Sequence, residues 1–126
     1  IVYIASPYAG NVKDNAAFAK AACRMAMEQG SVPVAAHLLY PQILDDTVPE
    51  QRELGIRMGL RLLETCSELW LCGSRITGGM QEELKTAWRH GIPVRRIPWE
   101  TVAGFLQPEP DMGGQVQPMG CIGTCL

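Results

Sequence analysis

Short apolar runs alternate with helix-type patterns along the first hundred residues, and this alternation constrains the fold more than any other feature. The apolar runs are IVYIAS at 1–6, SVPVAAHLLY at 31–40, ELWLCG at 68–73 and IPVRRIPW at 92–99. Apolar residues spaced by three and four separate them, over 11–29, 49–65 and 78–91. Such alternation predicts a mostly parallel sheet with helices on both faces. We therefore expect a single-domain α/β fold, a flavodoxin-like or Rossmann-like three-layer sandwich.

The domain is predicted to span residues 1–106, because the apolar periods end there. With 47% hydrophobic residues, a chain of 126 residues can bury a core without disulfides or metals. Residues 107–126 are rich in proline and glycine, and we predict a disordered tail. The five cysteines are an odd number, and three of them lie in apolar periodic segments, which favours reduced thiols over a disulfide framework.

Charge and hydropathy narrow the kind of partner. The formal net charge of -2 gives no electrostatic signature for nucleic acid or an anionic membrane, so neither is an expected partner. No apolar stretch reaches the roughly 18 residues of a membrane span, and the first residues form a strand pattern rather than a signal peptide. We expect a cytoplasmic protein that binds a small neutral or anionic molecule.

Three segments are predicted to meet at the carboxyl ends of the strands, where parallel sheets bind ligands. They are SPYAG at 6–10, AAHLLYPQILDD at 35–46 and GSRITGGMQEE at 73–83. In the third segment, Gly78 and Gly79 allow close approach of the backbone to a ligand. The helix that follows turns its free N–H groups toward the same edge, which favours an anionic or electron-rich group.

Two glutamates follow the glycine pair, and they have two interpretations. Acids in the first turn of a helix are favoured by its dipole, and on residue chemistry alone we prefer that explanation. Glu83, however, lies beside the apolar face formed by Met80, Leu84 and Ala87, whereas Glu82 points more toward water. Glu83 is therefore the better candidate for a partly buried carboxylate, which could attack a sugar carbon and form a covalent glycosyl intermediate.

The segments IVYIASPYAG, VPVAAHLLYPQILDD and ITGGMQEELKTAWRHGIPV resemble the nucleoside 2-deoxyribosyltransferase-like superfamily, closest to its small DUF4406-type branch of phages and bacteria. The most specific match is Gly79, Glu83, Leu84 and Ala87 at their spacing. The resemblance implies that Glu83 is the nucleophile of a transferase or hydrolase acting on a nucleoside or nucleotide N-glycosidic bond. It also implies that Tyr8 borders the sugar and orients Glu83, that the protein is a homo-oligomer, and that no cofactor or metal is required.

Further residues at the predicted edge of the sheet are expected to contact the substrate. His37 could donate to a base or a phosphate, and it could equally be a structural residue. Arg52 could hold a phosphate bidentately. The predicted substrate-binding residues are Ser6, Pro7, His37, Arg52, Gly78, Gly79 and Met80.

The sequence lacks acidic residues at three positions where the superfamily carries them. Gly59 and Thr77 stand where we expect aspartates, and Ser67 replaces the acid that ends the second helix. Acids of the loop after residue 40 could substitute for them, or they could form a solvated surface; these acids are Asp45, Asp46 and Glu50. Three functions therefore remain open: an enzyme, a non-catalytic nucleotide-binding module, and an interaction partner in a phage or mobile element.

Overall fold

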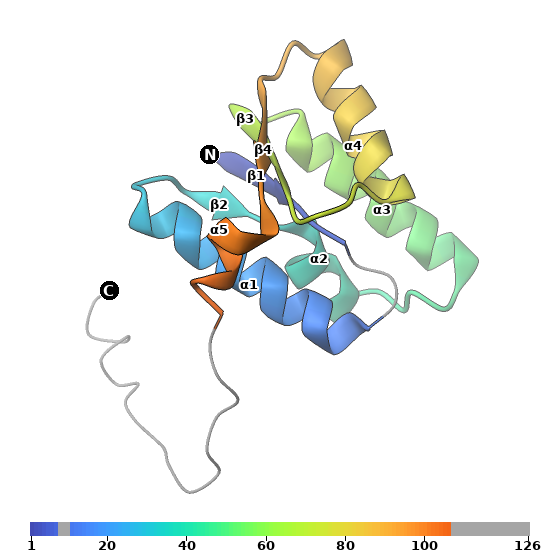
Figure 1. The fold of residues 1–126 in the computed structure, drawn as a ribbon. Coiled ribbons are helices and arrows are strands. Elements are labelled where there is room, and N and C mark those ends of the chain that lie inside the picture. The colour runs from blue at the N-terminus through green and yellow to red at the C-terminus, as the bar shows by residue number, and fades with distance from the viewer. Residues whose placement is uncertain (8–10, 107–126) are drawn as a thin grey trace, which may run out of the picture.

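The computed structural model describes residues 1–7 and 11–106, which form a parallel sheet between two helical layers (Figure 1). The four strands lie in the order β2 (Pro33–Val34), β1 (Val2–Ala5), β3 (Glu68–Cys72) and β4 (Val94–Ile97). All three pairings are parallel. The predicted α/β fold class with a mostly parallel sheet is confirmed. The predicted tail, 107–126, lies outside the described residues.

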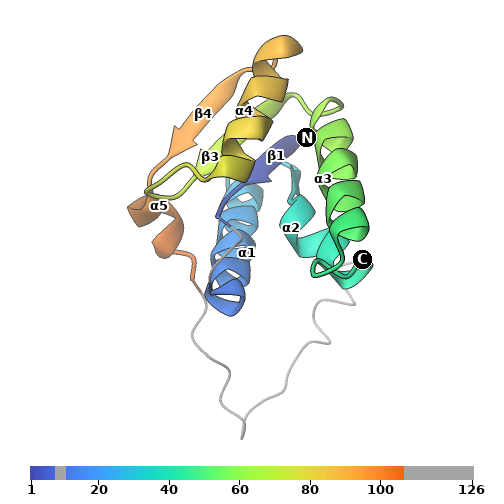
Figure 2. The ribbon, with the colours of Figure 1, turned by 90° about the vertical axis from the view of Figure 1, so that its right-hand side faces the viewer.

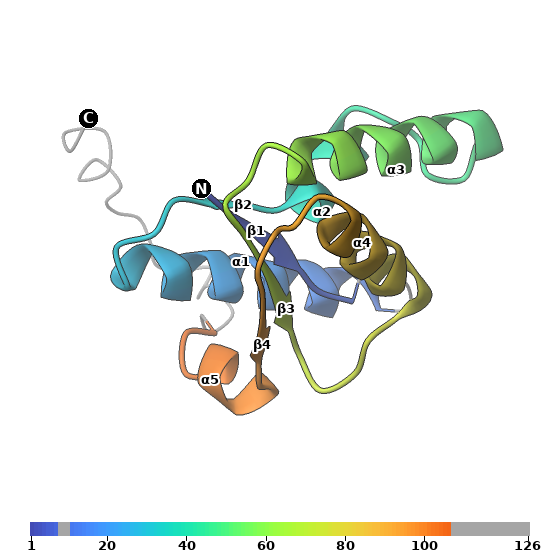
Figure 3. The same cartoon turned by 90° about the horizontal axis from the view of Figure 1, so that it is seen from above.

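Helices cover both faces of the sheet because side chains alternate along each strand. The helices are α1 (Val12–Glu28), α2 (Ala36–Leu39), the 3-10 turn η1 (Tyr40–Gln42), α3 (Pro49–Leu63), α4 (Gly78–Arg89) and α5 (Trp99–Ala103). Val2 and Ile4 of β1 pack into one core with α1 and α5. Tyr3 and Ala5 face the opposite core, which includes side chains of α2, α3 and α4. Figure 3 shows the two layers on either side of the strands.

The ends of the longer helices follow local sequence signals. Asn11 caps α1, its side-chain oxygen accepting from the backbone N–H of Asp14 at 3.1 Å. Gly30 follows this helix with a φ of 85°, the left-handed conformation that favours glycine. Pro49 occupies the first turn of α3, where its missing N–H has no intrahelical partner to lose. The predicted positions of these helices are confirmed.

The predicted strand over 31–40 is wrong beyond Val34. β2 contains two residues and pairs with β1 alone, while residues 36–39 form α2 and residues 40–42 form η1. The segment AAHLL has no β-branched residue, and alanine and leucine are strong helix formers. His37 therefore projects from α2 and not from the end of a strand.

The strand order β2-β1-β3-β4 has its switch point between β1 and β3, and parallel sheets commonly bind ligands outside the carboxyl ends of the strands at such a point. The chain leaves β1 through α1 toward β2 on one side, and leaves β3 through α4 toward β4 on the other. Helices α3 and α4 contact each other and lie side by side over one face of the sheet (Figure 2).

Within residues 1–7 and 11–106, the structure contains no helix that combines the length and the hydropathy of a membrane-spanning segment.

Candidate active site

A buried carboxylate paired with a tyrosine lies at the junction of β1 and α4. Glu83 is 6% exposed and Tyr3 is 1% exposed. The Tyr3 hydroxyl donates a hydrogen bond of 2.6 Å to Oε2 of Glu83. The other oxygen, Oε1, is buried and has no hydrogen-bond partner among the described residues. A carboxylate held by one oxygen, with the second oxygen unsatisfied, is suited to interact with a bound molecule.

Burial changes the acidity of both members of this pair. Removal from water raises the pKa of Glu83 to about 7, although the hydrogen bond from Tyr3 acts in the opposite direction. Burial also raises the pKa of Tyr3 well above its ordinary value, and the charge of Glu83 adds to that effect. Near neutral pH, Glu83 is therefore divided between the protonated and the ionised form, as is typical of carboxylates at functional sites.

Glu83 lines a cavity of about 720 Å³. This volume is within the range of small-molecule sites in proteins. The walls come from β1, from the segment α2–η1, from α3 and from the start of α4. Its apolar lining includes Tyr40, Leu44, Ile56 and Leu60, and its polar side chains include His37, Asp46, Gln51, Arg52 and Glu82. A ring system could therefore pack against one part of the cavity while polar groups hold another.

The cavity is open because glycines form parts of its walls. A Cβ atom added at Gly78 or Gly79 would meet nothing within 4 Å among the described residues, so these two positions leave room for a ligand. Gly59 of α3 is different, since a Cβ atom there would lie 3.3 Å from Cβ of Ala36 and 3.4 Å from the Tyr3 hydroxyl. An aspartate at position 59 would therefore require its neighbours to move.

The start of α4 explains why the two glutamates differ. Thr77 is the N-cap of this helix, and its hydroxyl accepts from the backbone N–H of Met80 at 3.3 Å. Thr77 thus performs a capping function that an aspartate performs equally well. Glu82 and Glu83 lie beyond the first turn, where the helix dipole has little effect, so the first-turn interpretation is wrong. Glu82 is exposed and pairs with Lys85 at 3.4 Å, whereas Glu83 is buried, as predicted.

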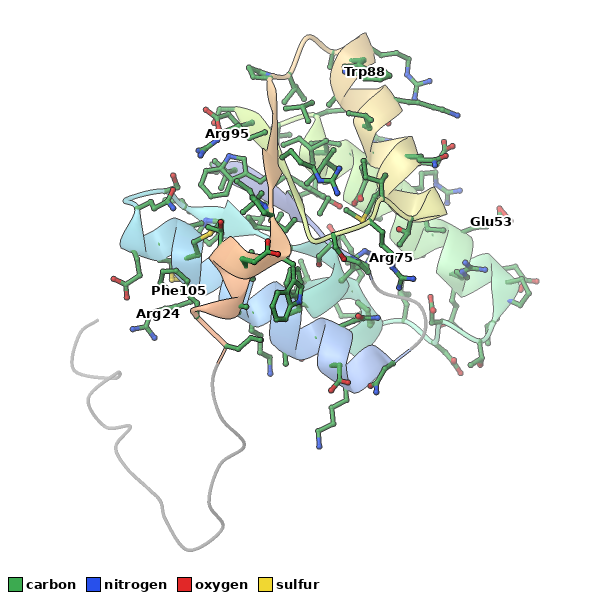
Figure 4. All side chains as sticks on the ribbon, viewed as in Figure 1. Arg24, Glu53, Arg75, Trp88, Arg95 and Phe105 are labelled. Carbon is green, nitrogen blue, oxygen red and sulfur yellow. The ribbon has the colours of Figure 1, made fainter. Side chains whose placement is uncertain are left out.

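The predicted substrate-binding residues divide into two groups. His37, Arg52, Gly78 and Gly79 line the same cavity as Glu83. The others do not line it. Ser6 and Met80 are each 1% exposed, and Met80 belongs to the core beside α4. Pro7 lines a separate, smaller cavity of about 210 Å³ together with Ser74 and Arg75, which follow β3; Arg75 is labelled in Figure 4. Tyr8 lies outside the described residues. The roles of all these residues stay predictions.

The acids of the loop between η1 and α3 have different surroundings. Asp45 is engaged locally, because its Oδ1 accepts from the backbone N–H and the hydroxyl of Thr47 at 2.9 and 2.6 Å. Asp46 lines the cavity, whereas Glu50 does not. No cluster of three His, Cys, Asp or Glu side chains that could hold a metal ion occurs within residues 1–7 and 11–106.

Tyr3 is the site residue that the sequence interpretation missed. Its contact with Glu83 joins residues 80 positions apart in the chain. A signal was present, because a tyrosine inside an apolar strand such as IVYIA must find a partner for its hydroxyl when it is buried. The partner itself is set by the packing of α4 against β1.

The arrangement of the parallel sheet and its helices is shared with a solved enzyme structure. The structure is similar to that of a 2-deoxyribosyltransferase from the psychrotolerant bacterium Bacillus psychrosaccharolyticus, with a TM-score of 0.64 over 77% of this chain and 71% of that chain, at 16% sequence identity. The chain thus has a nucleoside 2-deoxyribosyltransferase-like fold. It belongs to the family described as Domain of unknown function (DUF7768), which matches residues 1–97. No match is found among curated proteins.

Proposed function

We propose that the protein is a transferase or hydrolase of a nucleoside or nucleotide N-glycosidic bond, with Glu83 as the nucleophile. The observation that carries the proposal is the buried Glu83 carboxylate, which lines a cavity of suitable size and has one oxygen without a partner. The similarity of the fold to a 2-deoxyribosyltransferase supports the same reaction class. The proposed substrate is a nucleoside or a nucleotide.

The proposed reaction assigns different roles to the two oxygens of Glu83. The Tyr3 hydroxyl holds Oε2 and thereby leaves Oε1 of Glu83 for attack on the anomeric carbon. The new C–O bond forms as the C–N bond to the base breaks, which gives a glycosyl ester on Glu83. A second base or water then takes the sugar. Tyr40 and Arg52 line the same cavity. We propose that the apolar lining around Tyr40 packs against the base and that Arg52 binds any phosphate on the sugar.

The proposal is tested by incubating the purified protein with nucleosides and nucleoside monophosphates, and measuring free base by chromatography. The wild type should release base, and mass spectrometry should detect a glycosyl adduct on Glu83. Glu83→Gln should lower the rate at least about 1,000-fold and remove the adduct. Glu53→Gln is the control, because Glu53 is an exposed glutamate of α3 that projects away from the protein (Figure 4).

A non-catalytic nucleotide-binding module is the second candidate. The observation that favours it is Gly59, where an expected aspartate is absent and where its neighbours leave little space for a side chain. This candidate predicts that a nucleotide raises the melting temperature of the wild type and of Glu83→Gln alike, with no base released by either. Melting temperatures measured on the same proteins and nucleotides, together with base release, therefore separate the two functions.

Three finer proposals accompany the function. We propose a relationship to the small DUF4406-type branch of phages and bacteria, a homo-oligomeric assembly, and a cytoplasmic location. Sedimentation of the purified protein tests the assembly. A monomer at concentrations where the protein is active would contradict it.

A further inference from the structure

A histidine and an aspartate line the same cavity as Glu83 but come from a different wall. His37 is half-buried in α2, and Asp46 is exposed in the loop that follows η1. Burial lowers the pKa of His37, and the negative charge of Asp46 opposes that effect. Histidine is the side chain that most often moves a proton in enzymes, and a carboxylate that lines the same cavity favours its protonated form.

The reaction proposed for Glu83 needs such a group. The departing base must gain a proton, and the incoming water must lose one. Glu83 cannot do either while it is bonded to the sugar, and positions 59 and 77 carry no acid. The other ionisable side chains that line the cavity are Tyr3 from β1, Tyr40 from η1, Arg52 from α3 and Glu82 from α4. Among the residues that line the cavity, His37 is the one whose ordinary pKa lies near neutrality.

We propose that His37 carries the proton in the reaction at Glu83, giving it to the departing base and taking one from the incoming water, with Asp46 as its positioning residue. This inference rests on the proposed glycosidic function and adds the acid and base to it.

The two steps balance in atoms and electrons. In the first step, Oε1 of Glu83 bonds to the anomeric carbon, the C–N bond breaks with its electron pair on the base, and that nitrogen takes a proton from the protonated His37. In the second step, the water oxygen bonds to the anomeric carbon and a water proton passes to neutral His37. The C–O bond to Glu83 breaks with its pair returning to the carboxylate. The products are free base and free sugar, and His37 ends protonated for the next cycle.

The test uses a substrate whose leaving group needs no proton, 4-nitrophenyl 2-deoxyriboside, together with azide, a nucleophile that needs no base. His37→Gln should release about one equivalent of nitrophenolate in a rapid burst and then stall with the sugar on Glu83. Azide should restore the turnover of His37→Gln and yield a glycosyl azide. The turnover rate of the wild type should not rise when azide is added. On nucleosides, His37→Gln should lose about 100-fold or more in rate. Asp46→Asn should shift the pH dependence of the nucleoside reaction, because the pKa of His37 falls without the nearby charge.

The outcomes separate this inference from the proposed function. If the wild type releases no base from any nucleoside or nucleoside monophosphate, both are refuted. If the wild type is active, this inference alone is refuted when His37→Gln keeps the wild-type rate on nucleosides, or when it loses the rate without a burst and without rescue by azide. His37→Asn provides a second variant, and circular dichroism verifies that both variants are folded.

Discussion

Burial of Glu83 should make the stability of the protein fall as the pH rises from about 4.5 to 7. The folded-state pKa of Glu83 is about 7, against an ordinary value of 4.5. Between these two values the folded protein binds more protons than the unfolded chain, so raising the pH favours unfolding. At about 1.4 kcal/mol per pKa unit, ionisation of Glu83 costs the folded state roughly 3 kcal/mol by pH 8.

Glu83→Gln should remove this dependence, since the amide is nearly isosteric with the protonated acid and does not ionise. We expect the wild type and the variant to have similar free energies of unfolding at pH 4.5. The variant should become more stable than the wild type by roughly 3 kcal/mol at pH 8. His37 changes stability in the opposite direction, because its lowered pKa reduces stability as the pH falls. The difference between the two proteins is therefore the quantity to measure.

Urea denaturation followed by circular dichroism at pH 4.5, 6, 7 and 8 gives these free energies. Glu53→Gln serves as the control and should follow the wild type at each pH, because its side chain is exposed. Parallel curves for wild type and Glu83→Gln would refute the reasoning. They would mean that Glu83 titrates as an ordinary glutamate and that its carboxylate is not desolvated in the native protein.

Three further predictions concern the surroundings of Glu83. Tyr3→Phe removes the hydrogen bond that lowers the pKa of Glu83. The pH midpoint of the stability change, and that of activity, should therefore rise by about one unit. An unchanged midpoint would contradict the 2.6 Å contact between Tyr3 and Glu83. Gly59→Asp should lower stability by about 1–3 kcal/mol because of its close neighbours, whereas Gly79→Ala should change it by less than about 1 kcal/mol, as compared by thermal denaturation. Thr77→Ala should cost about 1 kcal/mol in urea denaturation by removing the cap of α4, and Thr77→Asp should restore it.

The order of the four strands and the three long helices was predictable because its signals are local. Apolar periods of two and of three to four residues identify strands and helices without reference to the rest of the chain. Asn11, Gly30 and Pro49 mark helix ends for reasons that depend on a few neighbouring residues. The segment 35–40 was assigned wrongly because an apolar run of that length fits a strand and a short helix equally well.

The position of Glu83 on its helix was also readable from the sequence, but its environment was not. The helical period places Glu83 next to an apolar face and Glu82 toward water, and the burial of the two side chains agrees. The period does not say how deep the carboxylate lies or what it contacts. The role of Tyr8, which follows from the resemblance, stays a prediction because Tyr8 lies outside the described residues; the contact between Tyr3 and Glu83 was not predicted.

The sequence by itself thus determined the layered α/β fold, the positions of the three long helices and the burial of Glu83 rather than Glu82. Only the tertiary structure decided that Tyr3 meets Glu83, that a side chain at position 59 would crowd Ala36 and the Tyr3 hydroxyl, and that His37 lines the cavity from α2 rather than from a strand. The physical reason is distance along the chain. Periodicity and capping act within one or two turns, whereas these contacts depend on how β1, α2, α3 and α4 pack around one cavity.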